Sequence, residues 1–167
     1  MNALRKPPKP VTPARPLFVI ARDDTGVHVY PDIRRVLDIQ HIGAGEHDSI
    51  EFFDIRGCSL VPTFHESGTL SSLSENGDRP DADVVQARLR TVMQHLRATI
   101  DQRLARAGNS TITREQALSQ IPDLEGRSLE ECFDLLDVAF GHANSRYGGD
   151  GASRRDPGSW WHNFWCH

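Results

Sequence analysis

The sequence predicts an α+β fold, in which a small antiparallel β-β-α-β-β sheet packs against a long central helix and is followed by a helical C-terminal half. Three observations predict it. Residues 17–64 contain short runs of β-branched and aromatic residues, one unbroken helical period runs from Asp81 to Gly108, and two capping-box spacings follow. With 167 residues, 38% of them hydrophobic, the chain can bury the core of one such domain.

We expect one domain over residues 17–167, preceded by an arm over residues 1–16. The arm contains five of the ten prolines and four basic residues without an acid, which is typical of an extended, disordered segment. Within the domain we expect a strand-rich lobe over 17–64, a surface linker over 65–80 and a helical lobe over 81–167. The linker is predicted from its Ser, Gly, Asn and Asp content.

The strand-rich lobe begins with a predicted hairpin, because the apolar run from Leu17 and the alternating residues Val27 to Tyr30 flank a turn-forming Asp-Asp-Thr-Gly segment. A short amphipathic helix is expected from Ile33 to Ile39. Two further strands are expected at Ile50 to Asp54 and at Ser59 to Phe64, with Pro62 interrupting the second. One short helix cannot cover such a sheet, so the long helix is the expected cover of its open face.

The long helix has apolar residues at the spacing of one helical face, with Asp81 as the expected N-cap and Gly108 beyond its end. Its five arginines lie between two acidic regions of the chain, and we expect those regions to satisfy them. The apolar residues are Val85, Leu89, Val92, Met93, Leu96, Ile100 and Leu104.

Two further helices are predicted after Gly108. Thr113 and Gln116 have the capping-box spacing, and that helix should end near Gln120, before Pro122. Ser128 and Glu131 repeat the spacing at the start of a helix that is expected to reach about Asn144, with Val138 on its mostly apolar side.

Composition excludes several classes of function. The net charge of −4 argues against nucleic acid as a partner, and no apolar run is long enough for a transmembrane helix or a signal peptide. Three widely spaced cysteines argue against a secreted disulfide framework, so we expect reduced thiols and a cytoplasmic protein. No phosphate-binding or dinucleotide-binding motif occurs, and the sequence predicts no cofactor and no catalytic nucleophile.

An acidic group beside the third expected strand is the first candidate binding site. Glu46, Asp48, Glu51 and Asp54 could form a docking face for a basic protein, because a patch of one charge sign accelerates encounter and selects partners. A small hydrolase that uses His47, Asp48, Glu51 and Asp54 is the alternative for the same stretch.

The C-terminal tail is the second candidate, because four aromatic residues lie within six positions there. Trp160, Trp161 and Trp165 could form a hot spot for a partner, or they could pin the C-terminus to the protein's own core. We predict no metal site, since the chain lacks CxxC and HExxH motifs. The weak alternative is zinc bound by His162, Cys166 and His167, with Cys132 or His142 as the fourth ligand.

The stretch from Val27 to Phe64 combines a V-x-V-Y strand, a short helix that ends in Leu-Asp-Ile, an acidic aromatic strand and a Phe-Asp-x-x-Gly turn. This combination resembles a pattern in small uncharacterised bacterial proteins, some of which are similar to immunity proteins that neutralise a cognate toxin. The resemblance implies a non-catalytic protein that binds another protein, and it assigns no residue roles. A self-associating structural or phage-related component is a further alternative.

Overall fold

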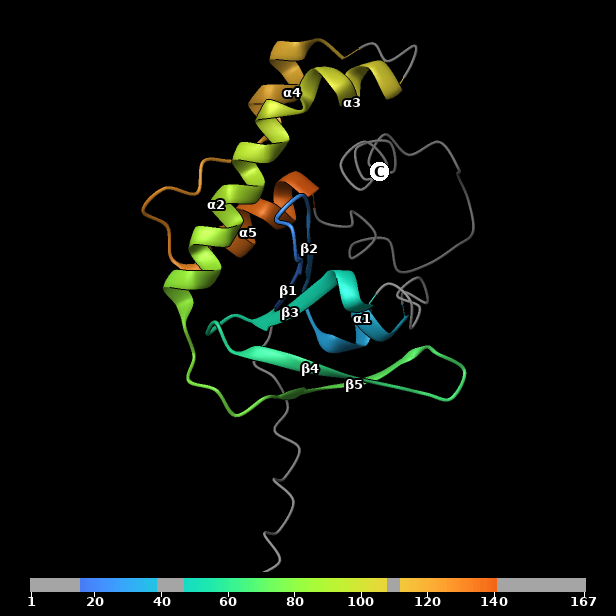
Figure 1. The fold of residues 1–167 in the computed structure, drawn as a ribbon. Coiled ribbons are helices and arrows are strands. Elements are labelled where there is room, and N and C mark those ends of the chain that lie inside the picture. The colour runs from blue at the N-terminus through green and yellow to red at the C-terminus, as the bar shows by residue number, and fades with distance from the viewer. Residues whose placement is uncertain (1–15, 39–46, 108–111, 141–167) are drawn as a thin grey trace, which may run out of the picture.

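The computed structural model describes residues 16–38, 47–107 and 112–140. These residues form an α+β fold with one five-stranded antiparallel sheet, which confirms the predicted class (Figure 1). The strand order is β2-β1-β3-β4-β5. The strands are β1 (Leu17–Ala21), β2 (Val27–Tyr30), β3 (Ile50–Asp54), β4 (Ser59–Phe64) and β5 (Leu70–Glu75).

Five α-helices and one short 3-10 helix accompany the sheet in the described part of the chain. The short helix α1 follows β2, and the 3-10 helix η1 leads directly into β3. The other helices follow β5. Their bounds are α1 (Ile33–Asp38), η1 (His47–Ser49), α2 (Ala82–Ala98), α3 (Ile100–Arg106), α4 (Arg114–Gln120) and α5 (Leu129–Phe140).

The sheet is covered on both faces, because alternate residues of its strands point to opposite sides. Phe18 and Ile20 of β1 belong to a core cluster with α2, α4 and α5. Leu17 and Val19 belong to a second cluster, to which α1 contributes the buried Val36. The long helix therefore covers one face of the sheet, as predicted, and α1 covers the other.

Strand β5 corrects the predicted linker, because it lies within residues 65–80. A β-bulge disturbs the alternation of apolar and polar residues that would have indicated this strand. Thr63 pairs with Ser72 and Phe64 pairs with Leu70, so Ser71 is left out of the register. The extra residue puts Leu70 and Leu73 in the same core cluster although they are three positions apart, which hides the period-two pattern of a strand.

The central helix is interrupted at Thr99, so the predicted segment from Asp81 to Gly108 forms α2 and α3 rather than one rod. The Thr99 hydroxyl donates to the carbonyl oxygen of His95 at 2.9 Å, an interaction that often bends helices. Figure 1 shows α3 turning away from the axis of α2. Six of the seven predicted apolar residues, Val85 to Ile100, are buried, and Leu104 packs against the same core.

The predicted helix starts are confirmed. The Asp81 carboxylate accepts from the backbone N–H of Val84 at 3.1 Å, and Thr113 forms a complete capping box with Gln116. The Ser128 backbone N–H donates to the Glu131 carboxylate at 2.8 Å, and the Glu131 N–H donates to the Ser128 hydroxyl at 3.2 Å. Among the described helices, none combines the length and the apolar composition that a bilayer crossing requires.

Candidate functional site

A tight turn over residues 54–58 joins β3 to β4 and builds the candidate site. The Gly57 N–H donates to the Asp54 carbonyl at 2.9 Å, and the Asp54 N–H donates to the Cys58 carbonyl at 3.0 Å. Gly57 has a φ of +83°, a conformation that side chains rarely adopt. The sequence Asp-Ile-Arg-Gly-Cys therefore closes a hairpin in which Asp54, Arg56 and Cys58 lie close to one another.

The carboxylate of Asp54 is fully buried at 0% exposure, and its two oxygens accept hydrogen bonds from different groups. Oδ1 accepts from the backbone N–H groups of Arg56 at 2.9 Å and of Cys58 at 3.0 Å. Oδ2 accepts from the Arg56 side chain, from Nε at 3.1 Å and from Nη2 at 2.7 Å. Oδ1 thus stabilises the turn, and Oδ2 binds the Arg56 guanidinium.

Arg56 bridges this turn to strand β5. Its Nη2 group also donates to Oε1 of Glu75, which the β4–β5 register places opposite Leu60. The hydrogen bonds to Asp54 are the largest cause that raises the pKa of Arg56, followed by the bond to Glu75. The Arg56 side chain is 47% exposed, so this guanidinium reaches the buried carboxylate from the solvent side.

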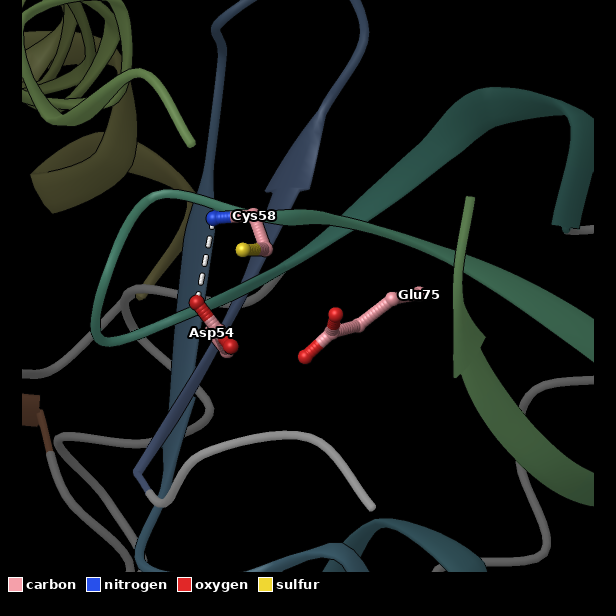
Figure 2. A group of neighbouring side chains, drawn as sticks. All are labelled: Asp54, Cys58 and Glu75. Carbon is pink, nitrogen blue, oxygen red and sulfur yellow. Dashed lines mark hydrogen bonds between the residues drawn. The ribbon is translucent and has the colours of Figure 1, made fainter. Parts of the chain in front are cut away.

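Cys58 completes the cluster. Its side chain is buried, and burial is the largest cause that raises the pKa of its thiol above the usual 9.0, followed by the charge of Asp54. The thiol therefore stays protonated at neutral pH, which makes it a weak nucleophile. One side-chain ligand atom from each of Asp54, Cys58 and Glu75 lies within 4.8 Å of the others. Figure 2 shows the Glu75 side chain pointing toward Asp54 and Cys58.

The predicted acidic face is divided by the sheet. Phe53 belongs to the core cluster under α2 and Phe52 to the cluster under α1, so by strand alternation Glu51 and Asp54 lie on opposite faces. Asp54 is buried, and so it offers no docking surface. Asp48 is exposed in η1. Glu51 and Asp54, which the hydrolase alternative uses together, therefore do not converge on one site.

Glu51 is held by Arg88 of α2, which forms an ion pair with it beside the sheet. Arg88 Nε also donates to Asp24 at 2.8 Å, Nη2 donates to the carbonyl of Ala21 at 2.9 Å, and the guanidinium lies 5.5 Å from the centre of the Phe53 ring. This agrees with the expectation that neighbouring acidic regions satisfy helix arginines, as does the 3.7 Å pair between Arg90 and Glu125.

Several predicted site residues lie outside the described residues, namely Glu46, Trp160, Trp161 and Trp165. The possible zinc ligands His142, His162, Cys166 and His167 lie outside them as well. His47 begins η1. Cys132 is buried in the core on α5, where burial is the largest cause that raises the pKa of its thiol.

The outer side of α5 carries a surface that the sequence analysis missed. Glu130 and Asp134 are exposed, and Val138 is 89% exposed rather than part of the apolar side. The three residues are spaced four apart and so follow one stripe of the helix. That spacing was the available signal, because a residue four after Asp134 must share its polar side.

The Asp54, Cys58 and Glu75 cluster was also missed. The Phe-Asp-x-x-Gly turn was recognised in the sequence, but Glu75 fell in the segment that was predicted as a linker. Comparison of the chain with protein-family models, curated proteins and solved structures found no match.

Proposed function

We propose that this protein acts in the cytoplasm by binding another protein, as an immunity-type inhibitor of a basic toxin domain, and that the outer side of α5 is its docking surface. The observation that carries the proposal is Val138, which is 89% exposed in a stripe with two exposed carboxylates. Burying this side chain against a partner would remove apolar surface from water and so favour association.

The charge around this stripe favours a basic partner. Residues 112–140 contain seven acids and two arginines. The guanidinium of Arg127 lies 3.5 Å from Glu131, whose carboxylate also caps the helix, whereas Glu130 and Asp134 stand exposed on the outer side. A negative face of this kind speeds association with a positive surface and disfavours nucleic acid.

A catalytic role for the acidic group near β3 has less support. Glu51 is paired with Arg88 and Asp54 with Arg56, on opposite faces of the sheet. Asp48 has an exposed side chain, so we retain the region around η1 as the alternative docking surface.

The test uses the full chain and the protein encoded by the gene beside it, because immunity proteins are usually encoded next to their targets. Binding is measured for wild type, for Glu130→Lys combined with Asp134→Lys, and for Val138→Asp. We expect a one-to-one complex that each variant weakens by roughly tenfold or more. Charge reversal should mainly slow association and reduce its salt dependence, whereas the Val138 change should speed dissociation.

Glu115→Lys on α4 is the matched control, because Glu115 is exposed on a different helix. It should leave affinity within about threefold of wild type. If Asp48→Lys abolishes binding while the α5 variants bind normally, the docking surface lies near η1 instead. Absence of any complex, or oligomers of the isolated chain in a solution mass measurement, contradicts the inhibitor proposal and favours the self-associating alternative.

A further inference from the structure

We propose that Asp54, Cys58 and Glu75 form a binding site for a divalent transition metal of the zinc class, and that Arg56 holds this site closed. The three residues come from the end of β3, the turn before β4 and the end of β5, so the sheet brings together side chains up to 21 positions apart. The site does not depend on the proposed docking surface of α5.

The donor set suits such a metal. A cysteine sulfur and two carboxylate oxygens are ligands for zinc and cobalt, whereas magnesium and calcium prefer oxygen alone. Ligand atoms around a tetrahedral zinc ion lie roughly 3.4–3.7 Å apart, given the usual Zn–S and Zn–O bond lengths. The three atoms here lie within 4.8 Å of one another, so a modest rotation of the partly exposed Glu75 side chain can bring them into range.

The hydrogen bonds of Asp54 allow a metal to enter without unfolding the turn. Oδ1 is bound to two backbone N–H groups and can keep the turn closed. Oδ2 accepts from the Arg56 side chain, and Glu75 accepts from the same Nη2 atom. This guanidinium group therefore occupies the place between the two carboxylates where a metal ion would bind.

Charge is conserved when the cations exchange. The incoming dication replaces the single positive charge of the guanidinium and the proton of the Cys58 thiol, which passes to water. The formal charge of the cluster is unchanged, and no oxidation or reduction takes place. The Arg56 side chain is 47% exposed, so it can swing into solvent when the metal replaces its hydrogen bonds to the two carboxylates.

The test titrates Co²⁺ into the full-length protein after its metals have been removed with a chelator. Binding to sulfur is followed by the thiolate-to-cobalt charge-transfer absorption, and Zn²⁺ is then added as a competitor. We expect one Co²⁺ per chain, complete displacement by Zn²⁺ and loss of the charge-transfer band in Cys58→Ser. Glu75→Gln should weaken binding, and circular dichroism checks that each variant is folded.

Arg56→Gln distinguishes a metal site that Arg56 closes from an ordinary ion pair. Removing the competing cation should tighten cobalt binding by roughly tenfold or more, because the metal no longer has to displace charge-assisted hydrogen bonds. Arg114→Gln, which removes the exposed 3.0 Å pair with Asp101, is the matched control and should leave the affinity unchanged.

Three results would overturn the inference: no stoichiometric cobalt binding to the wild-type chain, a charge-transfer band that survives in Cys58→Ser but is lost in Cys166→Ser, or weaker binding in a folded Arg56→Gln. The second result would place the metal in the C-terminal tail. The third would mean that Arg56 supports the site rather than closing it.

Discussion

At the scale of single residues, Gly57 determines how closely the β3–β4 turn packs against the start of α2. Its carbonyl accepts from the Asp81 N–H at 3.1 Å, and an added Cβ would lie 2.6 Å from the backbone nitrogen of Ala82. The turn that carries Asp54 and Cys58 therefore packs directly on the start of α2. Because the neighbouring atoms are backbone, they cannot move aside as a flexible side chain would.

We predict that Gly57→Ala lowers the free energy of unfolding by about 2–4 kcal/mol, because it combines an unfavourable φ with a steric clash. Urea denaturation measures the loss. Gly77→Ala is the control, since Gly77 has a φ of +86° but no atom within 4 Å of an added Cβ. It should lose only about 1 kcal/mol, the cost of the backbone conformation alone. Equal losses in the two variants would show that the contact with α2 contributes nothing.

At the scale of elements, Arg88 fastens α2 to the sheet. It is 17% exposed and reaches Asp24 in the β1–β2 turn, the Ala21 carbonyl and Glu51 of β3. Burial opposes the charge of Arg88, but its hydrogen bonds to Asp24 and Glu51 outweigh burial and raise its pKa. One side chain thus joins a helix to two neighbouring strands.

Arg88→Met should lower the free energy of unfolding by about 1–3 kcal/mol, between the values for exposed and buried ion pairs, because Asp24 and Glu51 are only partly covered. Methionine keeps most of the apolar stem over Phe53. Arg114→Met is the comparison, because Arg114 and Asp101 are both mostly exposed, and it should cost less than about 0.5 kcal/mol. If Arg88→Met loses no more stability than Arg114→Met, then Arg88 does not stabilise the packing of α2 on the sheet.

The elements that the sequence predicted are those whose pattern is local. The period of α2 and the capping boxes of α4 and α5 depend on residues three or four positions apart, which the chain itself displays. Strand β5 could not be recognised in the same way, because its bulge appears only through pairing with β4. The interruption at Thr99 depends on a hydrogen bond from its hydroxyl to the carbonyl oxygen of His95. The apolar period of the segment continues through this position, so the pattern did not indicate a break.

The acidic group beside β3 shows how far the candidate site could be predicted from the sequence. Glu51 and Asp54 are close in sequence, and they were predicted as one surface. A separation of three residues in a strand places them on opposite faces, so alternation already argued against that surface. The sequence could not show which distant residues lie beside them in the fold. Arg88, which pairs with Glu51, is 37 positions away from it, and Glu75, a neighbour of Asp54, is 21 positions away.

At the scale of the whole molecule, β1 contributes to both core clusters, one on each face of the sheet. Phe18 and Ile20 belong to the cluster under α2, Leu17 and Val19 to the cluster under α1, and β1 pairs with β2 on one side and β3 on the other. Strands β4 and β5 are covered less completely. Pairing between β3 and β4 is limited to Leu60 and Ser59, and beyond them the hairpin extends past the rest of the sheet, with Val61 47% exposed (Figure 1).

This arrangement predicts a gradient of local stability that native-state hydrogen exchange can measure. Amides of β1 should exchange most slowly, because opening them disrupts both cores and two strand pairings. Amides in the outer part of β4 and β5 should exchange at least about tenfold faster, a difference of roughly 1.4 kcal/mol in opening free energy, since one pairing and one core hold them. If the hairpin exchanges as slowly as β1, then it opens only with the whole domain. The cluster of Asp54, Cys58 and Glu75 lies at the inner end of this hairpin, because Glu75 pairs with Leu60 and Leu60 pairs with Phe52 of β3, so the amides around it should exchange more slowly than those of the outer part.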